Sequence, residues 1–225
     1  MRAQTFWSDK YDFYQSGHSG STAAIGYYQA DFRMLNDRVH ALGSKNDFGG
    51  GFFSIGTGCI VPFGGRYGES DAYLGADWIL RQKINVNDSF SVQFEGIHFI
   101  TAPVLGKDVF PSDDWDCVLS LGADWGFTRY AENYPSHINA YTNAFFSPMF
   151  RTDFRYVHKH FIAGARFLFR YDVTNPKWAS KVSSEYPDVS GTAFSGVGAE
   201  FYIGYHPLPK KHDEHYQYID NGVGQ

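Results

Sequence analysis

Charged residues recur at alternate positions along much of the chain. In the segment 150–156, for example, charges occupy every second position, at Arg151, Asp153 and Arg155, and three of the other four residues are aromatic. Charges taken out of water are stable only when they are paired and hydrogen-bonded. The near-equal numbers of acids and bases therefore predict a structural charge network on one face of a sheet, formed by Asp31, Arg33, Asp77, Arg81, Glu95, Asp124, Arg151, Asp153, Arg155, Arg166, Arg170 and Glu200.

A nucleophile elbow is the first catalytic motif to consider. Gly17–Ser21 reads Gly-His-Ser-Gly-Ser, which ends in serine where that motif needs glycine. No strand-turn-helix pattern surrounds it, so we interpret it as part of a linker.

Histidine and serine residues elsewhere in the chain are the other candidates for a catalytic site, of the kind found in enzymes that modify the membrane lipid called lipid A. His98 falls in phase with an apolar strand face, whereas His40 with Ser44, and Ser136 with His137, lie in expected loops. A catalytic site needs a nucleophile, a base and an orienting group within reach of one another. Neighbouring strand positions do not supply all three, so we predict no catalytic residues.

Metal-binding patterns are weak. Asp113, Asp114 and Asp116 flank Trp115 and could offer oxygen ligands to calcium, but we expect a solvated acidic turn. The remaining histidines lack the four-ligand spacing of a zinc site. We therefore predict no metal and no cofactor.

Hydrophobic alternation with a period of two runs through eight segments. Such alternation is the signal of strands with two distinct faces. The strands are predicted at 24–35, 52–63, 72–83, 90–95, 119–128, 140–156, 161–171 and 193–205.

Composition supports strands and excludes several classes. Aromatic residues make up 19% of the 225 residues, and they fit a pleated sheet better than a helix. No run approaches the roughly 18 apolar residues of a membrane-spanning helix. The net charge of −5 and the lack of a basic stripe argue against nucleic-acid binding.

The two strand faces differ in a way that favours a membrane. One face is large, aromatic and almost free of charge, whereas the other carries compact arginine, aspartate and glycine. A soluble barrel would show charges to water, but a transmembrane barrel shows apolar side chains to lipid. We therefore predict an all-β, antiparallel up-and-down transmembrane β-barrel of about eight strands, with the charges in its lumen.

With these features the chain resembles the small eight-stranded bacterial outer-membrane barrels of the OmpA/OmpX type. The resemblance rests on patterning over 24–206 and on the aromatic closing segment Ala199–Tyr205. It implies a location in the bacterial outer membrane after removal of a signal peptide. It also implies contact with outer-membrane lipids, including lipopolysaccharide.

Three regions follow from the pattern. We expect an N-terminal segment at 1–23 that serves as a linker, plug or extra strand, a barrel at 24–206 and a polar tail at 207–225.

For function, the sequence favours a non-enzymatic anchor, scaffold or accessory subunit of a cell-envelope complex, with other envelope proteins as partners. An outer-membrane lipid A acylhydrolase or acyltransferase is the alternative. A soluble lipocalin-like ligand-binding barrel is the third.

Overall fold

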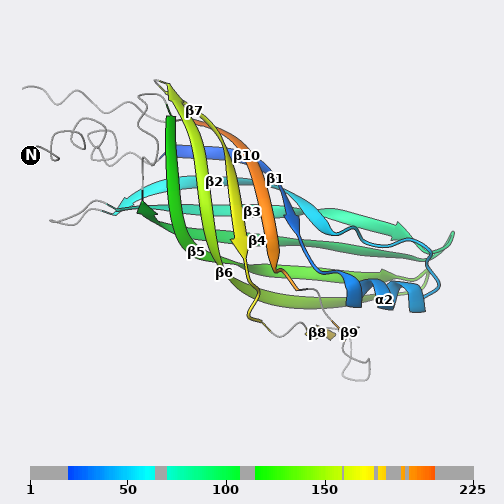
Figure 1. Ribbon diagram of the computed structural model, residues 1–225. Helices are drawn as coiled ribbons and strands as arrows, with labels where there is room; N and C mark the ends of the chain where they lie inside the picture. Colours follow the sequence, from blue (N-terminus) through cyan, green and yellow to red (C-terminus); the bar gives the residue numbers. More distant parts are fainter. Residues whose placement is uncertain are drawn as a thin grey trace, which may run out of the picture.

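The computed structural model describes residues 20–63, 70–106, 115–158, 160–174, 177–180, 189–190 and 193–205. Eight strands form an antiparallel sheet that closes where β1 meets β10 and where β5 meets β6 (Figure 1). The prediction of an all-β, up-and-down barrel of about eight strands is confirmed. The barrel strands are β1 (Gly20–Gln29), β2 (Gly51–Phe63), β3 (Ser70–Asn85), β4 (Ser91–Gly106), β5 (Trp115–Asn133), β6 (Ile138–His158), β7 (Phe161–Arg170) and β10 (Gly196–Tyr205).

The barrel wall is taller on one side than on the other. Strands β3 to β6 have 16 to 21 residues, whereas β1, β2, β7 and β10 have 10 to 13. The long strands continue past the short ones at the end where helix α2 (Arg33–Ala41) lies (Figure 1). We call this extension the tip sheet; it comprises residues 82–85, 91–95, 129–133 and 138–145. A short hairpin of β8 (Lys177–Ser180) and β9 (Val189–Ser190) pairs with β6 there.

Helix α2 belongs to an aromatic core at the tip sheet. Leu35 and Val39 stand one helical turn apart, and both are fully buried. Side chains spaced by four residues share one face of a helix, so α2 buries an apolar stripe and exposes its polar side. The core they join includes Phe32, Phe48, Phe52, Ile84, Val92, Phe94, Tyr130, Tyr141, Phe145 and Phe194.

The outer wall of the barrel carries large apolar side chains. Large apolar side chains with at least 38% of their surface exposed project outward from seven of the eight strands, and Ile97 and Phe99 of β4 are half-buried on the same face. We call this surface the apolar belt; it includes Ile25, Ile55, Trp78, Trp125, Phe127, Phe150, Phe154, Phe167, Phe169, Phe201 and Ile203. Among the described residues, no helix is long and apolar enough to cross a membrane.

The first predicted strand, 24–35, is wrong at its end. Strand β1 ends at Gln29, and helix α2 begins at Arg33. Alternation continues across this boundary, because Ala30 and Phe32 are still buried while Gln29 is exposed. Periodicity thus extended the strand too far. It also reversed the faces of β1, because Ala24, Tyr28 and Ala30 were predicted to face lipid but are buried inside, whereas Tyr27 and Gln29 face outward.

The face of β4 is also reversed. Val92 and Phe94 are fully buried inside the tip sheet, whereas Glu95 points outward. The expectation that the apolar face of a strand points toward lipid fails here, because the tip sheet packs its apolar face against a core that includes α2.

Strand β3 changes phase at a β-bulge. Ile79 pairs with Gly96, but the next partners are Gln82 and Phe94, so β3 carries one extra residue. A bulge of this kind moves every following side chain to the opposite face. Arg81 therefore points outward, contrary to the prediction, and Lys83 lies on the same outer face.

The predicted regions can be placed only in part. The barrel strands lie between Gly20 and Tyr205. Residues 1–19 and the tail 207–225 lie outside the described residues, and so does the Gly17–Ser19 part of the nucleophile-elbow motif.

Candidate functional site

The inner wall of the barrel gathers acids and bases from five strands. Eight of the twelve residues predicted for the charge network have side chains that are at most 4% exposed. They occupy alternate positions whose neighbours belong to the apolar belt, as the pleat requires. They are Asp77, Asp124, Arg151, Asp153, Arg155, Arg166, Arg170 and Glu200.

Asp153 of β6 is the centre of one part of this network. Its Oδ2 lies 3.4 Å from Arg151 Nη2, 3.5 Å from Arg155 Nη2 and 3.5 Å from Arg166 Nε. The Tyr202 hydroxyl donates a 2.6 Å hydrogen bond to its other oxygen, Oδ1. One buried carboxylate thus serves three guanidinium groups.

Arg166 of β7 connects Asp153 to the next acid. Its guanidinium carbon lies 3.7 Å from the ring centroid of Tyr202 and 4.2 Å from that of Tyr73. Its Nη1 donates to Tyr73 at 2.9 Å and to Glu200 at 3.2 Å, and its Nη2 donates to Thr22 at 3.2 Å. Stacking together with several acceptors is the environment in which arginine tolerates burial.

His98 of β4 is the centre of the second part. Its Nδ1 lies 2.9 Å from Asp124 Oδ1, and its Nε2 lies 3.7 Å from Asp77 Oδ2. Arg170 pairs with the other oxygen of Asp124 and donates to the Gln29 carbonyl at 3.1 Å. A fully buried imidazole is therefore held between two carboxylates.

Tyr28 joins the two parts into one network. Its hydroxyl lies between Asp77 Oδ2, at 3.1 Å, and Glu200 Oε1. The phenol ring also meets His98 edge to face, with centroids 4.9 Å apart. Contacts thus run without a break from Asp124 to Asp153.

Glycines on the inner wall make room for these side chains. A Cβ at Gly58 would lie 2.1 Å from the Tyr73 hydroxyl, and a Cβ at Gly56 would lie 1.7 Å from Asp77 Oδ1. The glycines interleaved with the polar positions are therefore a packing requirement of the network.

Four of the predicted network residues do not reach the lumen. Asp31 and Arg33 pair with each other just beyond β1, at 2.5 Å, and the Arg33 side chain is 86% exposed. Glu95 pairs with Arg81 at 2.7 Å and with Arg129 at 2.8 Å on the outside of the tip sheet. Asp31, Arg33 and Glu95 were predicted to face inward because the faces of β1 and β4 were assigned in reverse, whereas the bulge in β3 accounts for Arg81.

Sequence reasoning missed the aromatic and imidazole members of the network. Tyr73 shares the phase of Asp77, and Tyr202 shares that of Glu200, so their positions carried a signal. His98 was predicted to face lipid, because its neighbours in phase are apolar. That prediction is wrong, since those neighbours face the core.

The candidate catalytic pairs do not form a catalytic arrangement. Ser136 Oγ lies 2.9 Å from Nδ1 of the adjacent His137, and the imidazole stacks on Tyr134. Ser44 is engaged with the backbone of Asn46, while His40 pairs with Asp47. A serine hydrolase needs a carboxylate that orients the histidine paired with its serine, and among the described residues neither histidine has both partners.

The acidic cluster considered for calcium lies largely outside the described residues. Asp113 and Asp114 are not described, and no side-chain position is given for Asp116. Among the described residues no group of three or more His, Cys, Asp or Glu side chains could hold a metal ion.

A closed barrel with an apolar outer surface and a charged, filled lumen is the architecture of a small transmembrane β-barrel of the bacterial outer membrane. The predictions of this class and of this location are confirmed.

Two solved structures of Ail, the attachment invasion locus protein of Yersinia pestis, are similar to the chain. One is a complex with the heparin analogue sucrose octasulfate; it has 10% sequence identity and a TM-score of 0.49, and the match covers 84% of this chain and 97% of Ail. The other has the same identity and coverage, with a TM-score of 0.47. No protein-family model and no curated protein matches the sequence.

Proposed function

We propose that the protein is a non-enzymatic outer-membrane anchor that serves as a scaffold or accessory subunit of a cell-envelope complex. The observation that carries this proposal is the filled interior. Paired charges occupy one part of the lumen, and the aromatic core occupies the other. An interior of this kind supports membrane residence rather than transport or turnover.

The tip sheet supplies a surface on which such a scaffold would bind a partner. It stands beyond the short wall of the barrel, and α2 braces it from inside. Arg38 of α2 binds the buried Glu132 of β5 through two hydrogen bonds, at 2.8 and 3.2 Å. A braced sheet presents its outer residues with little loss of conformational entropy on binding.

The experiment is in-cell photo-crosslinking from the outer face of the tip sheet. A photoreactive amino acid at Lys83 or Gln93 should capture one defined envelope protein, and the same probe at Leu121 in the apolar belt should not. Absence of a defined product from both tip positions would overturn the scaffold proposal.

The alternative, a lipid A-modifying enzyme, is tested by mass spectrometry of lipid A from cells with and without the protein. The scaffold proposal predicts identical acylation in the two samples. Gain or loss of an acyl chain would instead support the enzyme and direct attention to His40 and His137.

A further inference from the structure

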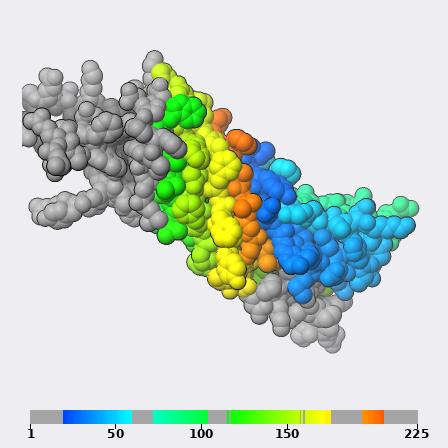
Figure 2. Space-filling view, in the orientation of Figure 1, coloured from blue at the N-terminus to red at the C-terminus, as the bar shows by residue number. Residues whose placement is uncertain are grey.

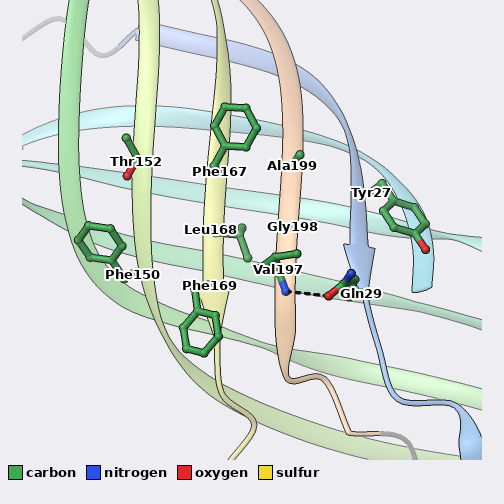
Figure 3. A pocket seen from close by; sticks show the side chains of 10 residues that line it. All are labelled: Tyr27, Gln29, Phe150, Thr152, Phe167, Leu168, Phe169, Val197, Gly198 and Ala199. Atoms are coloured by element: carbon green, nitrogen blue, oxygen red, sulfur yellow. Dashed lines mark hydrogen bonds between the residues drawn. The ribbon is translucent and has the colours of Figure 1, made fainter. Parts of the chain in front are cut away.

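A groove lies on the outer wall of the barrel where β6, β7, β10 and β1 run side by side (Figures 2 and 3). Its volume is about 420 Å³, and its lining is almost entirely apolar. It is lined by Tyr27, Gln29, Phe150, Thr152, Phe167, Leu168, Phe169, Val197, Gly198 and Ala199.

Differences in side-chain size across neighbouring strands create the groove. Phe167 of β7 has small register partners on both sides, Thr152 of β6 and Ala199 of β10. One step along the strands, Phe150 and Phe169 are register partners and form a tall aromatic wall. Figure 3 shows Thr152 and Ala199 on opposite sides of Phe167, with Phe150 and Phe169 below them.

The groove ends where the apolar belt ends. Gln29 is the last residue of β1, and the exposed Asp31–Arg33 ion pair follows two residues later. The Gln29 side chain projects outward, and its Oε1 accepts a 3.5 Å hydrogen bond from the Val197 amide (Figure 3). Among the described residues, its Nε2 has no acceptor. A hydrogen-bond donor therefore stands at the polar end of an otherwise apolar groove.

We propose that this groove is a binding site for one acyl chain of a membrane lipid in the leaflet on the α2 side. The hydrocarbon lies along Phe150, Phe167 and Phe169, and the ester or amide carbonyl at its head accepts a hydrogen bond from Gln29 Nε2. This inference rests on the membrane barrel itself and is independent of the scaffold role.

An acyl chain should bind more tightly in the groove than against the rest of the outer wall. Transfer of a chain from lipid to protein brings no hydrophobic gain, because the bilayer is equally apolar. Binding must then come from close van der Waals contact and from a hydrogen bond at the polar end of the groove. The aromatic walls supply the first of these, and Gln29 supplies the second.

The test uses the full-length protein in nanodiscs that contain phosphatidylethanolamine with a photoreactive group in its acyl chain. Labelling mapped by peptide mass spectrometry should concentrate on the segments 150–152, 167–169 and 197–199. Ala199→Trp, which fills the groove, should lower the labelling of these segments to that of the rest of the barrel wall. Gln29→Leu should lower it in part. Ala76→Trp is the matched control, because Ala76 faces outward on β3 away from the groove, and it should leave the labelling unchanged.

Three outcomes would overturn the proposal. They are even labelling around the whole barrel wall, an excess that survives Ala199→Trp, and protection of the groove by a second copy of the protein. Variants that do not fold are recognised independently, because a folded barrel migrates differently from a boiled one on a denaturing gel.

Discussion

Asp153 shows how a single acid stabilises several cations inside the barrel. Its two oxygens face three guanidinium groups and one phenol, all nearly inaccessible to water. Desolvation of each charge is costly, and the gain from pairing approximately offsets that cost only while every partner is present. Loss of the acid therefore matters more than loss of an ordinary ion pair.

Asp153→Asn should destabilise the barrel strongly. The amide keeps the shape of the side chain but leaves three buried cations without their shared anion, at a cost of about 3–5 kcal/mol. Asp31→Asn is the control, because its pair is exposed and contributes only about 0–1 kcal/mol. Urea unfolding in detergent micelles measures both, and equal stability of the two variants would contradict the role given to Asp153.

Substitution of Gly58 by a larger residue should lower the unfolding free energy of the barrel. A valine there would displace the Tyr73 hydroxyl and, through it, the stacked Arg166. Overpacking of this kind costs about 1–3 kcal/mol. Gly49→Val, where a Cβ meets nothing within 4 Å, should change the unfolding free energy little. A Gly58→Val variant as stable as the wild type would contradict the close packing of Tyr73 against Gly58.

Asp31 should titrate at an unusually low pH. Hydrogen bonds from the Arg33 side chain hold the pKa of this carboxyl below its ordinary value of 3.8. The pair therefore adds stability above that ordinary value, and the contribution is lost as the pH falls through the lowered pKa. Carboxyl carbon NMR should show the Asp31 pKa rising toward 3.8 in Arg33→Leu, whereas an unchanged pKa would deny the pairing.

At the scale of elements, Arg38 should hold α2 against the tip sheet. Arg38→Leu leaves the buried Glu132 carboxylate without its cationic partner and with neutral donors, the hydroxyls of Tyr130 and Tyr134, at a cost of about 1–3 kcal/mol. Hydrogen exchange should then be faster in α2 than in the wild type. The double variant Arg38→Leu/Glu132→Leu should recover part of the protection, because no charge remains buried. Equal exchange in the two variants would refute this coupling.

The strands were predictable from the sequence, but their faces only in part. Strands β5, β6, β7 and β10 alternate strictly, with apolar side chains toward lipid, so period and composition gave the correct face. Strands β1 and β4 were assigned in reverse, because apolar positions such as Tyr28, Val92 and Phe94 belong to the core formed with α2. Since that helix continues the buried positions Ala30 and Phe32, the sequence pattern alone could not separate it from β1.

The charge network was predictable wherever a strand stayed regular. Arg166, Arg170 and Glu200 lie on uninterrupted strands and reach the lumen as expected. Arg81 missed it, because one extra residue in β3 reverses the faces and no residue type marks that bulge. Pairings across the barrel, such as that of Arg170 with Asp124, depend on closure and curvature, which a single sequence does not encode locally.

At the scale of the whole molecule, side chains occupy the interior of the described barrel. The arginine, carboxylate and tyrosine network fills one part of the lumen, and Phe52, Phe94 and Phe194 pack in the other. An eight-stranded barrel is only wide enough for its own side chains to fill. The described part of the lumen is therefore filled by the barrel's own side chains.

Dye efflux from liposomes tests this central claim most directly. The purified protein is inserted into vesicles loaded with a small fluorescent dye, and insertion is verified by the gel shift between unboiled and boiled samples. The filled lumen predicts efflux no faster than from protein-free vesicles, and no stable conductance steps in planar bilayers. Rapid dye release or steady, ion-selective conductance from the inserted protein would contradict the account.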